Sequence, residues 1–143
     1  MENGLIEDND GNKCWYLNGE RHRTDGPAIE FADGDKYWYL NGELHRTEGA
    51  NGTKRWFVNG KLHRTDDPAV ELANGNKRWF VNGELHRTDG PAVEDTDGYK
   101  AWYQNGKRHR VDGPAIEDAG GNKLWYINNV AVPEHIIKWK NKI

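Results

Sequence analysis

The stretch that decides the fold runs from Lys77 to Glu94 and has the sequence KRWFVNGELHRTDGPAVE. Close copies of it fill the chain, so that tryptophan recurs at positions 15, 38, 56, 79, 102 and 125. The spacings between these tryptophans are 23, 18, 23, 23 and 23 residues, and a histidine follows the first five of them by seven residues. A register kept over the whole length indicates a tandem repeat of about six units.

An Asn-Gly pair lies between each tryptophan and its histidine. Asn-Gly flanked by alternating residues is a strong signal for a two-residue β-hairpin turn, because both central residues of that turn need a positive φ. A turn at Asn18-Gly19 pairs Trp15 with His22. The same geometry pairs Trp38 with His45 and Trp79 with His86. The unit therefore begins with a hairpin.

A second glycine turn precedes each tryptophan. Treated as two-residue turns, these segments place an Ile or Val of one strand opposite the next tryptophan, and Glu71 opposite Arg78. We therefore expect the tryptophans to form a core with these aliphatic residues. The predicted pairs are Ile6 with Trp15, Ile29 with Trp38, Val70 with Trp79, Val93 with Trp102, and Ile116 with Trp125.

The segment Thr-Asp-Gly-Pro-Ala interrupts the strand that links the two turns. Proline removes a ladder donor and glycine permits a bulge, so we predict one bulged residue here. The short copy, from His45 to Trp56, lacks five residues of this segment. An odd deletion would remove the bulge, so we predict a bulge-free copy and a local change of twist over residues 46–56.

These patterns predict an all-β protein, an elongated single-sheet antiparallel array of β-hairpin repeats. The array would span residues 1–130. Residues 131–143 break the repeat and are predicted to form a short C-terminal helical cap. Pro133 suits the first helical position, and Ile136, Ile137 and Trp139 would dock on the last hairpin.

Composition limits the class of function. Mean hydropathy is -1.05, 35% of residues are hydrophobic and net charge is -3, with seven Trp and six Tyr. Aromatic residues in a polar chain suit a structure one or two layers thick. Without a basic excess, we expect neither a nucleic acid nor a membrane as partner. The single cysteine excludes an intrachain disulfide, and the first residues lack the apolar segment of a signal peptide. We expect a cytoplasmic location, in the host cytoplasm if the chain is viral.

The unit resembles the MORN repeat. Tyr16, Gly19 and His22, with their equivalents, occupy MORN-like positions, and the resemblance covers about residues 4–130. Arginine replaces the glycine that usually follows histidine, and Lys-x-Trp replaces the usual first glycine. The motif His-Arg-x-Asp-Gly-Pro-Ala looks like a MORN variant of phage, giant-virus and bacterial proteins. The resemblance implies a scaffold or interaction module, with lipid binding proposed for some members.

Two sets of repeated polar residues are candidates for a site. The histidines stand about 10 Å apart in neighbouring units, whereas zinc ligands converge to about 2 Å from one ion. We therefore expect each histidine to stack on its tryptophan and bond a backbone group, and we expect no metal or other cofactor. The arginines are predicted to lie opposite the histidines, beside the Tyr/Phe residues, and to pair with nearby carboxylates. The candidate binding residues are Tyr39, Arg46, Phe57, Arg64, Phe80, Arg87, Tyr103 and Arg110.

No set of unique, converging groups indicates an enzyme, since serine is absent and Cys14 occurs in one copy alone. The leading prediction is a non-catalytic protein–protein interaction module. By its resemblance to phage and viral repeats, its partner would be a host protein, including a defence component that it blocks. Two alternatives stay open: a small-ligand or nucleotide-binding protein that uses the Arg/aromatic face, and a structural spacer or self-assembling scaffold. The short copy would hold the one non-repeating pocket.

Overall fold

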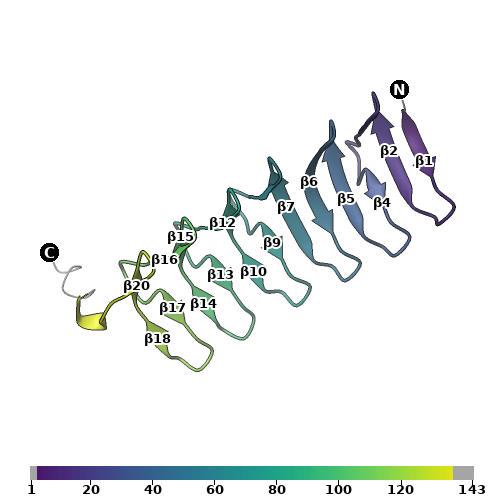
Figure 1. The fold of residues 1–143 in the computed structure, drawn as a ribbon. Helices are drawn as coiled ribbons and strands as arrows, with labels where there is room; N and C mark the ends of the chain where they lie inside the picture. Colours follow the sequence, from purple (N-terminus) through teal and green to yellow (C-terminus); the bar gives the residue numbers. More distant parts are fainter. Residues whose placement is uncertain (1–2, 137–143) are drawn as a thin grey trace.

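A computed structural model describes residues 3–136. It confirms the predicted fold class: the chain forms an elongated array of antiparallel strands in which the two termini lie at opposite ends (Figure 1). Strands follow one another across the main sheet in chain order. The strands along this sheet are β1 (Gly4–Glu7), β2 (Lys13–Leu17), β4 (Ile29–Glu30), β5 (Lys36–Leu40), β6 (Glu43–Glu48), β7 (Lys54–Val58), β9 (Val70–Glu71), β10 (Lys77–Arg78), β13 (Val93–Glu94), β14 (Lys100–Ala101), β17 (Ile116–Glu117) and β18 (Lys123–Leu124).

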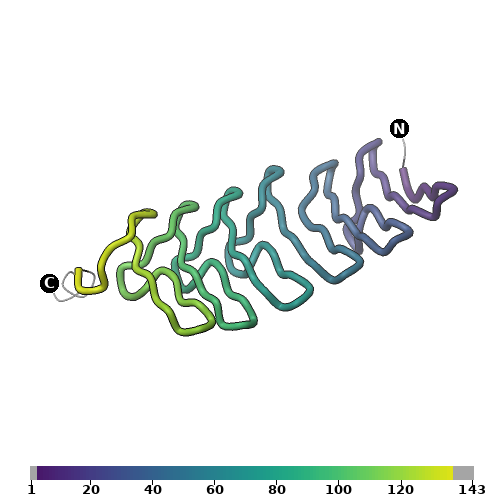
Figure 2. Tube along the Cα trace, turned by 60° about the horizontal axis from the view of Figure 1, so that its bottom comes forward, coloured from purple at the N-terminus to yellow at the C-terminus, as the bar shows by residue number. Residues whose placement is uncertain are grey.

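Short strands flank the Asn-Gly turns along one side of the array (Figures 1 and 2). They are β3 (Glu20–Arg21), β8 (Lys61–Leu62), β11 (Phe80–Val81), β12 (Glu84–Leu85), β15 (Tyr103–Gln104), β16 (Lys107–Arg108), β19 (Tyr126–Ile127) and β20 (Val130–Ala131). The first two pair with strands of the main sheet, and the others form separate two-stranded hairpins. Residues 134–136 form one helical turn after Pro133, where the cap was expected. The predicted docking of Ile137 and Trp139 lies outside the described residues. Between residues 3 and 136, no helix is long and apolar enough to cross a membrane.

The Asn-Gly turns have the predicted two-residue form. Asn18 and Gly19 have φ values of 54° and 78°, and the asparagines and glycines of the other copies also have positive φ. Tyr16 pairs with Arg21, and the N–H of His22 donates to the carbonyl oxygen of Trp15 at 3.0 Å. Both turn residues are left-handed, as the type I′ turn requires.

The glycine turns are one residue longer than predicted. At Asp33-Gly34 only the glycine has a positive φ, and Phe31 donates to the carbonyl of Asp35 at 2.9 Å. This three-residue loop, a type I turn followed by a left-handed glycine, is the other common hairpin connection. Each Ile or Val therefore pairs with the residue before the tryptophan. The observed pairs are Ile6–Cys14, Ile29–Tyr37, Val70–Arg78, Val93–Ala101 and Ile116–Leu124, and Glu71 pairs with Lys77.

This shift by one residue corrects the predicted core. Because neighbouring residues of a strand point to opposite faces, the aliphatic residues and the tryptophans lie on different faces of the sheet. The buried hydrophobic residues are small or β-branched, apart from Trp79 at 8% exposure. Four alanines that follow the prolines, Ala28, Ala69, Ala92 and Ala115, are fully buried. The core is thus a thin row along the sheet.

The predicted one-residue bulge is also wrong. Trp15 accepts from the N–H of His22, and its own N–H donates to the carbonyl of Ala28 at 2.8 Å. Residues 23–27 consequently leave the sheet as a complete loop opposite a single tryptophan. The same two bonds recur at Trp56, Trp79 and Trp102. We call residues 23–27 and their equivalents the arginine loop.

The short copy has no arginine loop, but it does contain a bulge. Tyr39 pairs with Leu44 and Trp38 pairs with Arg46, so His45 is the extra residue and does not pair with Trp38 as predicted. The five missing residues match the length of the arginine loop, which explains why the sheet stays in phase. As a result β6 runs without interruption from Glu43 to Glu48.

Side chains link each unit to the next along both rows of turns. In the hairpin row, Nδ1 of His22 accepts from the N–H of Asn41 at 3.0 Å. His63, His86 and His109 do the same for the following turns. In the row of glycine turns, Oδ1 of Asn12 accepts from the N–H of Ala32 at 2.9 Å. The histidine is therefore an inter-unit link, as its predicted backbone bond suggested.

Candidate binding face

The tryptophan face of the sheet carries a row of stacked tryptophan and arginine side chains. In each unit with an arginine loop, the guanidinium carbon lies 3.9 Å from the centre of the tryptophan ring of the same unit. In the short copy, Arg46 lies between two rings, 4.4 Å from Trp38 and 5.3 Å from Trp56. A cation over an indole ring is held by the negative potential of the ring face. We call this row the Trp–Arg ladder.

Each guanidinium also closes its own loop. Arg87 donates from Nε to Asp89 at 2.9 Å, and from Nη1 to the carbonyl oxygen of Pro91 and to Glu94, both at 3.0 Å. Arg23 and Arg110 repeat this arrangement with a longer contact to the strand glutamate. The predicted ion pairs are thus confirmed for four of the five arginines: Arg23–Asp25, Arg46–Glu48, Arg87–Asp89 and Arg110–Asp112.

The exception is Arg64. Its unit has Asp66-Asp67 where the other arginine loops have Asp-Gly, and Arg64 pairs with Asp67 at 3.2 Å rather than with the predicted Asp66. Among the described residues, the carboxylate of Asp66 has no ion-pair partner. One change from glycine to aspartate therefore frees the neighbouring carboxylate.

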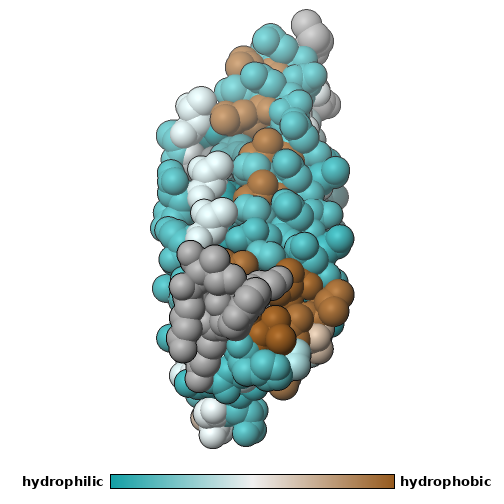
Figure 3. Space-filling model, turned by 90° about the vertical axis from the view of Figure 1, so that its left-hand side faces the viewer, coloured by the Kyte–Doolittle hydropathy of each residue, from teal (hydrophilic) through white to brown (hydrophobic). Residues whose placement is uncertain are grey.

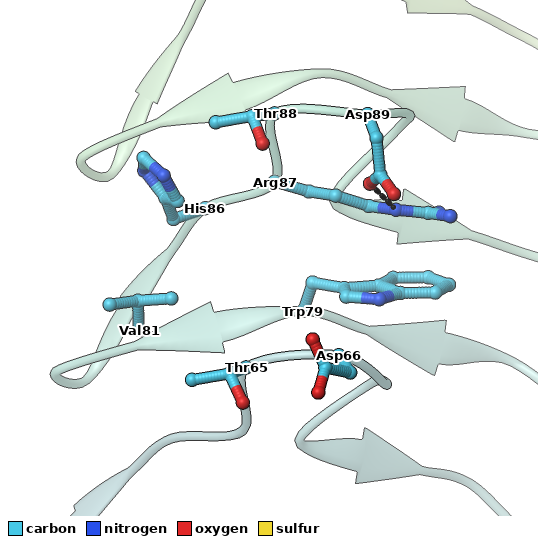
Figure 4. A pocket seen from close by; sticks show the side chains of 8 residues that line it. All are labelled: Thr65, Asp66, Trp79, Val81, His86, Arg87, Thr88 and Asp89. Carbon is cyan, nitrogen blue, oxygen red and sulfur yellow. Dashed lines mark hydrogen bonds and ion pairs between the residues drawn. The ribbon is translucent and has the colours of Figure 1, made fainter.

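Slots open along this face where the arginine loop of one unit stands over the tryptophan of the next. Figure 4 shows the slot at Trp79, with Thr65 and Asp66 on one side and Arg87 stacked on the other side of the ring. Its volume is about 360 Å³. The equivalent slot at Trp102, lined by Thr88 and Asp89, is about 390 Å³. In the first slot Asp66 points toward the ring of Trp79.

The predicted Arg and Tyr/Phe surface does not form as one row of side chains. The arginines stack on tryptophan, because the arginine loop breaks the alternation on which the prediction depended. The Tyr and Phe residues lie instead in the hairpin strands, where Phe80 pairs with Leu85 and Tyr103 with Arg108. The two sets meet through the backbone, since Arg64 donates to the carbonyl of Phe80 and Arg87 to that of Tyr103.

Sequence reasoning missed the loop residues Thr65, Asp66, Thr88 and Asp89 as slot walls. The available signal was the Asp66-Asp67 pair, which departs from the Asp-Gly of the other loops. In the part of the chain that the structure describes, no three His, Cys, Asp or Glu side chains are grouped as metal ligands.

A second hollow lies at the short copy. The hairpins before and after it lack the hydrogen bonds that join other neighbouring hairpins, such as Gly42 N–H to the carbonyl of Arg21. Between them is a cleft of about 210 Å³, lined mainly by Leu40, Leu44, Phe57 and Val58. We call it the Leu44 cleft. Its lining residues lie on either side of residues 46–56, the segment where the non-repeating pocket was predicted.

His45, which lines this cleft, and its neighbour Arg46 each have one nitrogen without a hydrogen-bond partner among the described residues. Nε2 of His45 and Nε of Arg46 are buried and accept or donate no hydrogen bond among the described residues. Burial and the nearby charge of Arg46 lower the pKa of His45 below its ordinary value. The short copy is thus the least satisfied part of the array.

The fold and this face define the class of protein: an elongated β-hairpin repeat array. Neither a model of a known protein family nor a curated protein matches the chain. The MORN resemblance therefore stays a prediction from the repeat itself.

Proposed function

We propose that the protein is a non-catalytic protein-binding module and that the Trp–Arg ladder face receives the partner. The observation that carries the proposal is the recurrence of one slot at neighbouring units, at Trp79 and again at Trp102. Slots repeated at a fixed interval suit a partner that presents side chains along an extended surface.

The chemistry of the slots favours a polar partner with basic side chains. At Trp79, the unpaired carboxylate of Asp66 and the side chain of Thr65 line the slot on one side of the indole ring. A lysine or arginine of the partner would gain a charge-assisted hydrogen bond there. The Trp102 slot differs because Asp89 is already paired with Arg87.

The contacts of the arginine side chains are unfavourable for binding a nucleotide. The arginines that would bind phosphate are stacked on tryptophan and paired with carboxylates, and Arg87 has a side-chain exposure of 22%. Binding of phosphate would have to break these ion pairs. This alternative predicts thermal stabilisation by nucleotides, because a ligand that binds only the native state raises its stability.

The test is affinity capture from lysate with three baits: the wild type, Asp66→Lys and Asp10→Lys. Asp66→Lys reverses the charge in the slot, whereas Asp10→Lys makes the same change at an exposed turn residue outside the ladder. We expect one protein to be retained by the wild type and by D10K, and to be lost by at least tenfold with D66K. Retention by D66K, or stabilisation by a nucleotide without any captured protein, would overturn the proposal.

The kind of partner follows from the repeat. If the chain belongs with the MORN-like repeats of phages and viruses, the captured protein would be a host factor, including a defence component, met in the host cytoplasm. Identification of the captured protein tests this step separately from the binding face. The scaffold alternative predicts self-association of the protein with no captured partner.

A further inference from the structure

The two ends of the main sheet expose strand edges that fit one another. Among the described residues, β1 has only β2 as a neighbour in this sheet and β18 has only β17. Figure 1 shows the two strands at opposite ends of the array. An unpaired edge presents a row of free N–H and C=O groups to any strand that approaches it.

Strand β1 corresponds to the strand that β18 lacks among the described residues. In complete units an arginine loop is followed by a return strand, such as Ile29–Glu30, which pairs with the strands on both of its sides. Ile6 and Glu7 of β1 are equivalent to this return strand, because they pair with Cys14 and Lys13 as Ile29 and Glu30 pair with Tyr37 and Lys36. Within residues 3–136, no return strand follows β20 to cover β18.

The exposed fractions of residues on the two edge strands show how much surface a neighbouring strand would cover. Ile6 is 42% exposed, whereas its equivalent Ile29, with strands on both sides, is 4% exposed. Leu124 is 51% exposed, whereas Ala101 at the equivalent position of the preceding unit is fully buried. Figure 3 looks onto the C-terminal end and shows hydrophobic atoms gathered there, where Leu124, Val130 and Ile136 are exposed.

A side-chain link between units is also half-formed at the C-terminal end. Nδ2 of Asn12 donates to Asp8 at 2.9 Å, which leaves Oδ1 to accept the N–H of Ala32 in the next unit. Nδ2 of Asn122 donates to Asp118 at 2.8 Å in the same way. Among residues 3–136, no N–H donates to Oδ1 of Asn122. The equivalent of Ala32 at the start of the chain is Asn9, whose N–H is likewise unbonded there.

We propose that a second copy of this chain continues the sheet, with its β1 paired antiparallel to β18 of the first copy. The register is the one that the array already uses between β14 and β17, where Lys100 pairs with Glu117 and Ala101 with Ile116. It places Lys123 opposite Glu7 of the second copy, and Leu124 opposite Ile6. Oδ1 of Asn122 then accepts the N–H of Asn9. The facing lysine and glutamate make the two edges complementary in charge.

The first hairpin has its own partner for the turn N–H that a preceding unit bonds elsewhere in the array. Inside the array, a histidine of the preceding unit accepts the N–H of the turn asparagine, but Val132 stands at the histidine position of the last unit. Asn3 compensates, since its Oδ1 accepts the N–H of Asn18 within the same chain. The hairpin at the junction therefore needs no histidine from the neighbouring copy.

Pairing of two different edges is heterologous, so each added copy leaves the same two edges free. The assembly is then an open filament that grows with protein concentration, unlike a symmetric dimer, which stops at two copies.

Sedimentation of the full-length protein over a range of concentrations tests the proposal with the variants Ile6→Lys and Leu124→Lys. A lysine on an edge strand blocks pairing of that edge. We expect the wild type to show an average mass that rises with concentration above 16.4 kDa. We expect each variant to remain a monomer, because one of the two edges that it needs is blocked. Val58→Lys, at a residue 46% exposed in the middle of the array, is the matched control and should assemble like the wild type.

A mixture of the two variants gives the sharpest result. I6K keeps a functional C-terminal edge and L124K keeps a functional N-terminal edge, so an equimolar mixture should form dimers of one copy each and nothing larger. A wild type that stays monomeric at all concentrations, or a variant that still forms homodimers, would overturn the proposal. Neither outcome depends on the partner proposed above, because no other protein is present.

Discussion

A Cβ atom placed on Gly113 would lie 2.7 Å from the guanidinium carbon of Arg110. The same approach occurs between Gly26 and Arg23 and between Gly90 and Arg87. The φ of these three glycines is not positive, so the constraint at this position is the space beside the arginine and not backbone freedom. In the loop that has Asp67 at this position, Arg64 still stacks on Trp56 at 3.9 Å, so the guanidinium can make room for a Cβ at a cost.

Gly113→Ala should therefore destabilise the protein by about 1 kcal/mol, the low end of the usual cost of forcing an extra carbon into a packed site, because the atoms that must shift are the end of the Arg110 side chain. Urea denaturation measures the change. Gly120→Ala is the control, because a Cβ there meets nothing closer than 3.4 Å and the backbone is not left-handed. Equal stabilities of the two variants would contradict this account of the loop.

Arg87→Lys tests the Trp–Arg ladder. Lysine keeps the charge but loses the planar group that stacks on Trp79 and bonds Asp89, Pro91 and Glu94 together. We expect a loss of roughly 1–2 kcal/mol of unfolding free energy. Arg55→Lys, at an exposed position, should change the stability by less than about 0.5 kcal/mol. The same small effect for R87K would show that the ladder adds no stability.

His45 should make the stability depend on pH. Its folded pKa is lowered by burial and by Arg46, so below about pH 6.5 the unfolded chain binds a proton that the folded chain does not. Above that pH, His45 is neutral in both states and does not lower the free energy of unfolding. As the pH falls toward the folded pKa of His45, the unfolded chain binds the proton and stability is lost. We expect stability to fall between pH 7 and pH 5.5, and to fall less in His45→Gln. Parallel curves for the two proteins would exclude His45 as a cause.

Insertion of Thr-Asp-Gly-Pro-Ala after Arg46 should restore an arginine loop to the short copy. The joined sequence then follows the pattern of the other units, and the hairpins on both sides can form the missing bonds. We expect the Leu44 cleft to close and the amides of residues 57–60 to exchange more slowly with solvent. Insertion of five glycines is the control, and equal exchange in both insertions would contradict the expectation.

The sequence was sufficient for the fold class and the Asn-Gly turns, because Asn18-Gly19 and its copies fit one turn type. It was not sufficient for the second turn. Asp33-Gly34 suits both a two-residue and a three-residue connection, and the choice depends on whether Asp33 adopts a positive φ. One residue of difference moved every Ile and Val to the face opposite the tryptophans.

For the site, the ion pairs of the arginines were predictable from their neighbours in sequence. The stacking of Arg87 on Trp79 was not, because strand alternation does not extend through a loop that leaves the sheet. The slot at Asp66 depends on a contact between units, which a pattern inside one unit does not contain. The bulge at His45 had the same origin, since the deletion removed a loop and left the bulge.

The unlinked hairpins of the short copy have a mechanical consequence. In a linear array each unit is stabilised by its neighbours, and cooperative unfolding spreads through the contacts between them. At the short copy, the missing bonds lie between the hairpins alone, because β6 and β7 pair over three residues, from Arg46 with Trp56 to Glu48 with Lys54. When the ribbon is bent, it should therefore open first on its hairpin side at this point, while the sheet side stays paired.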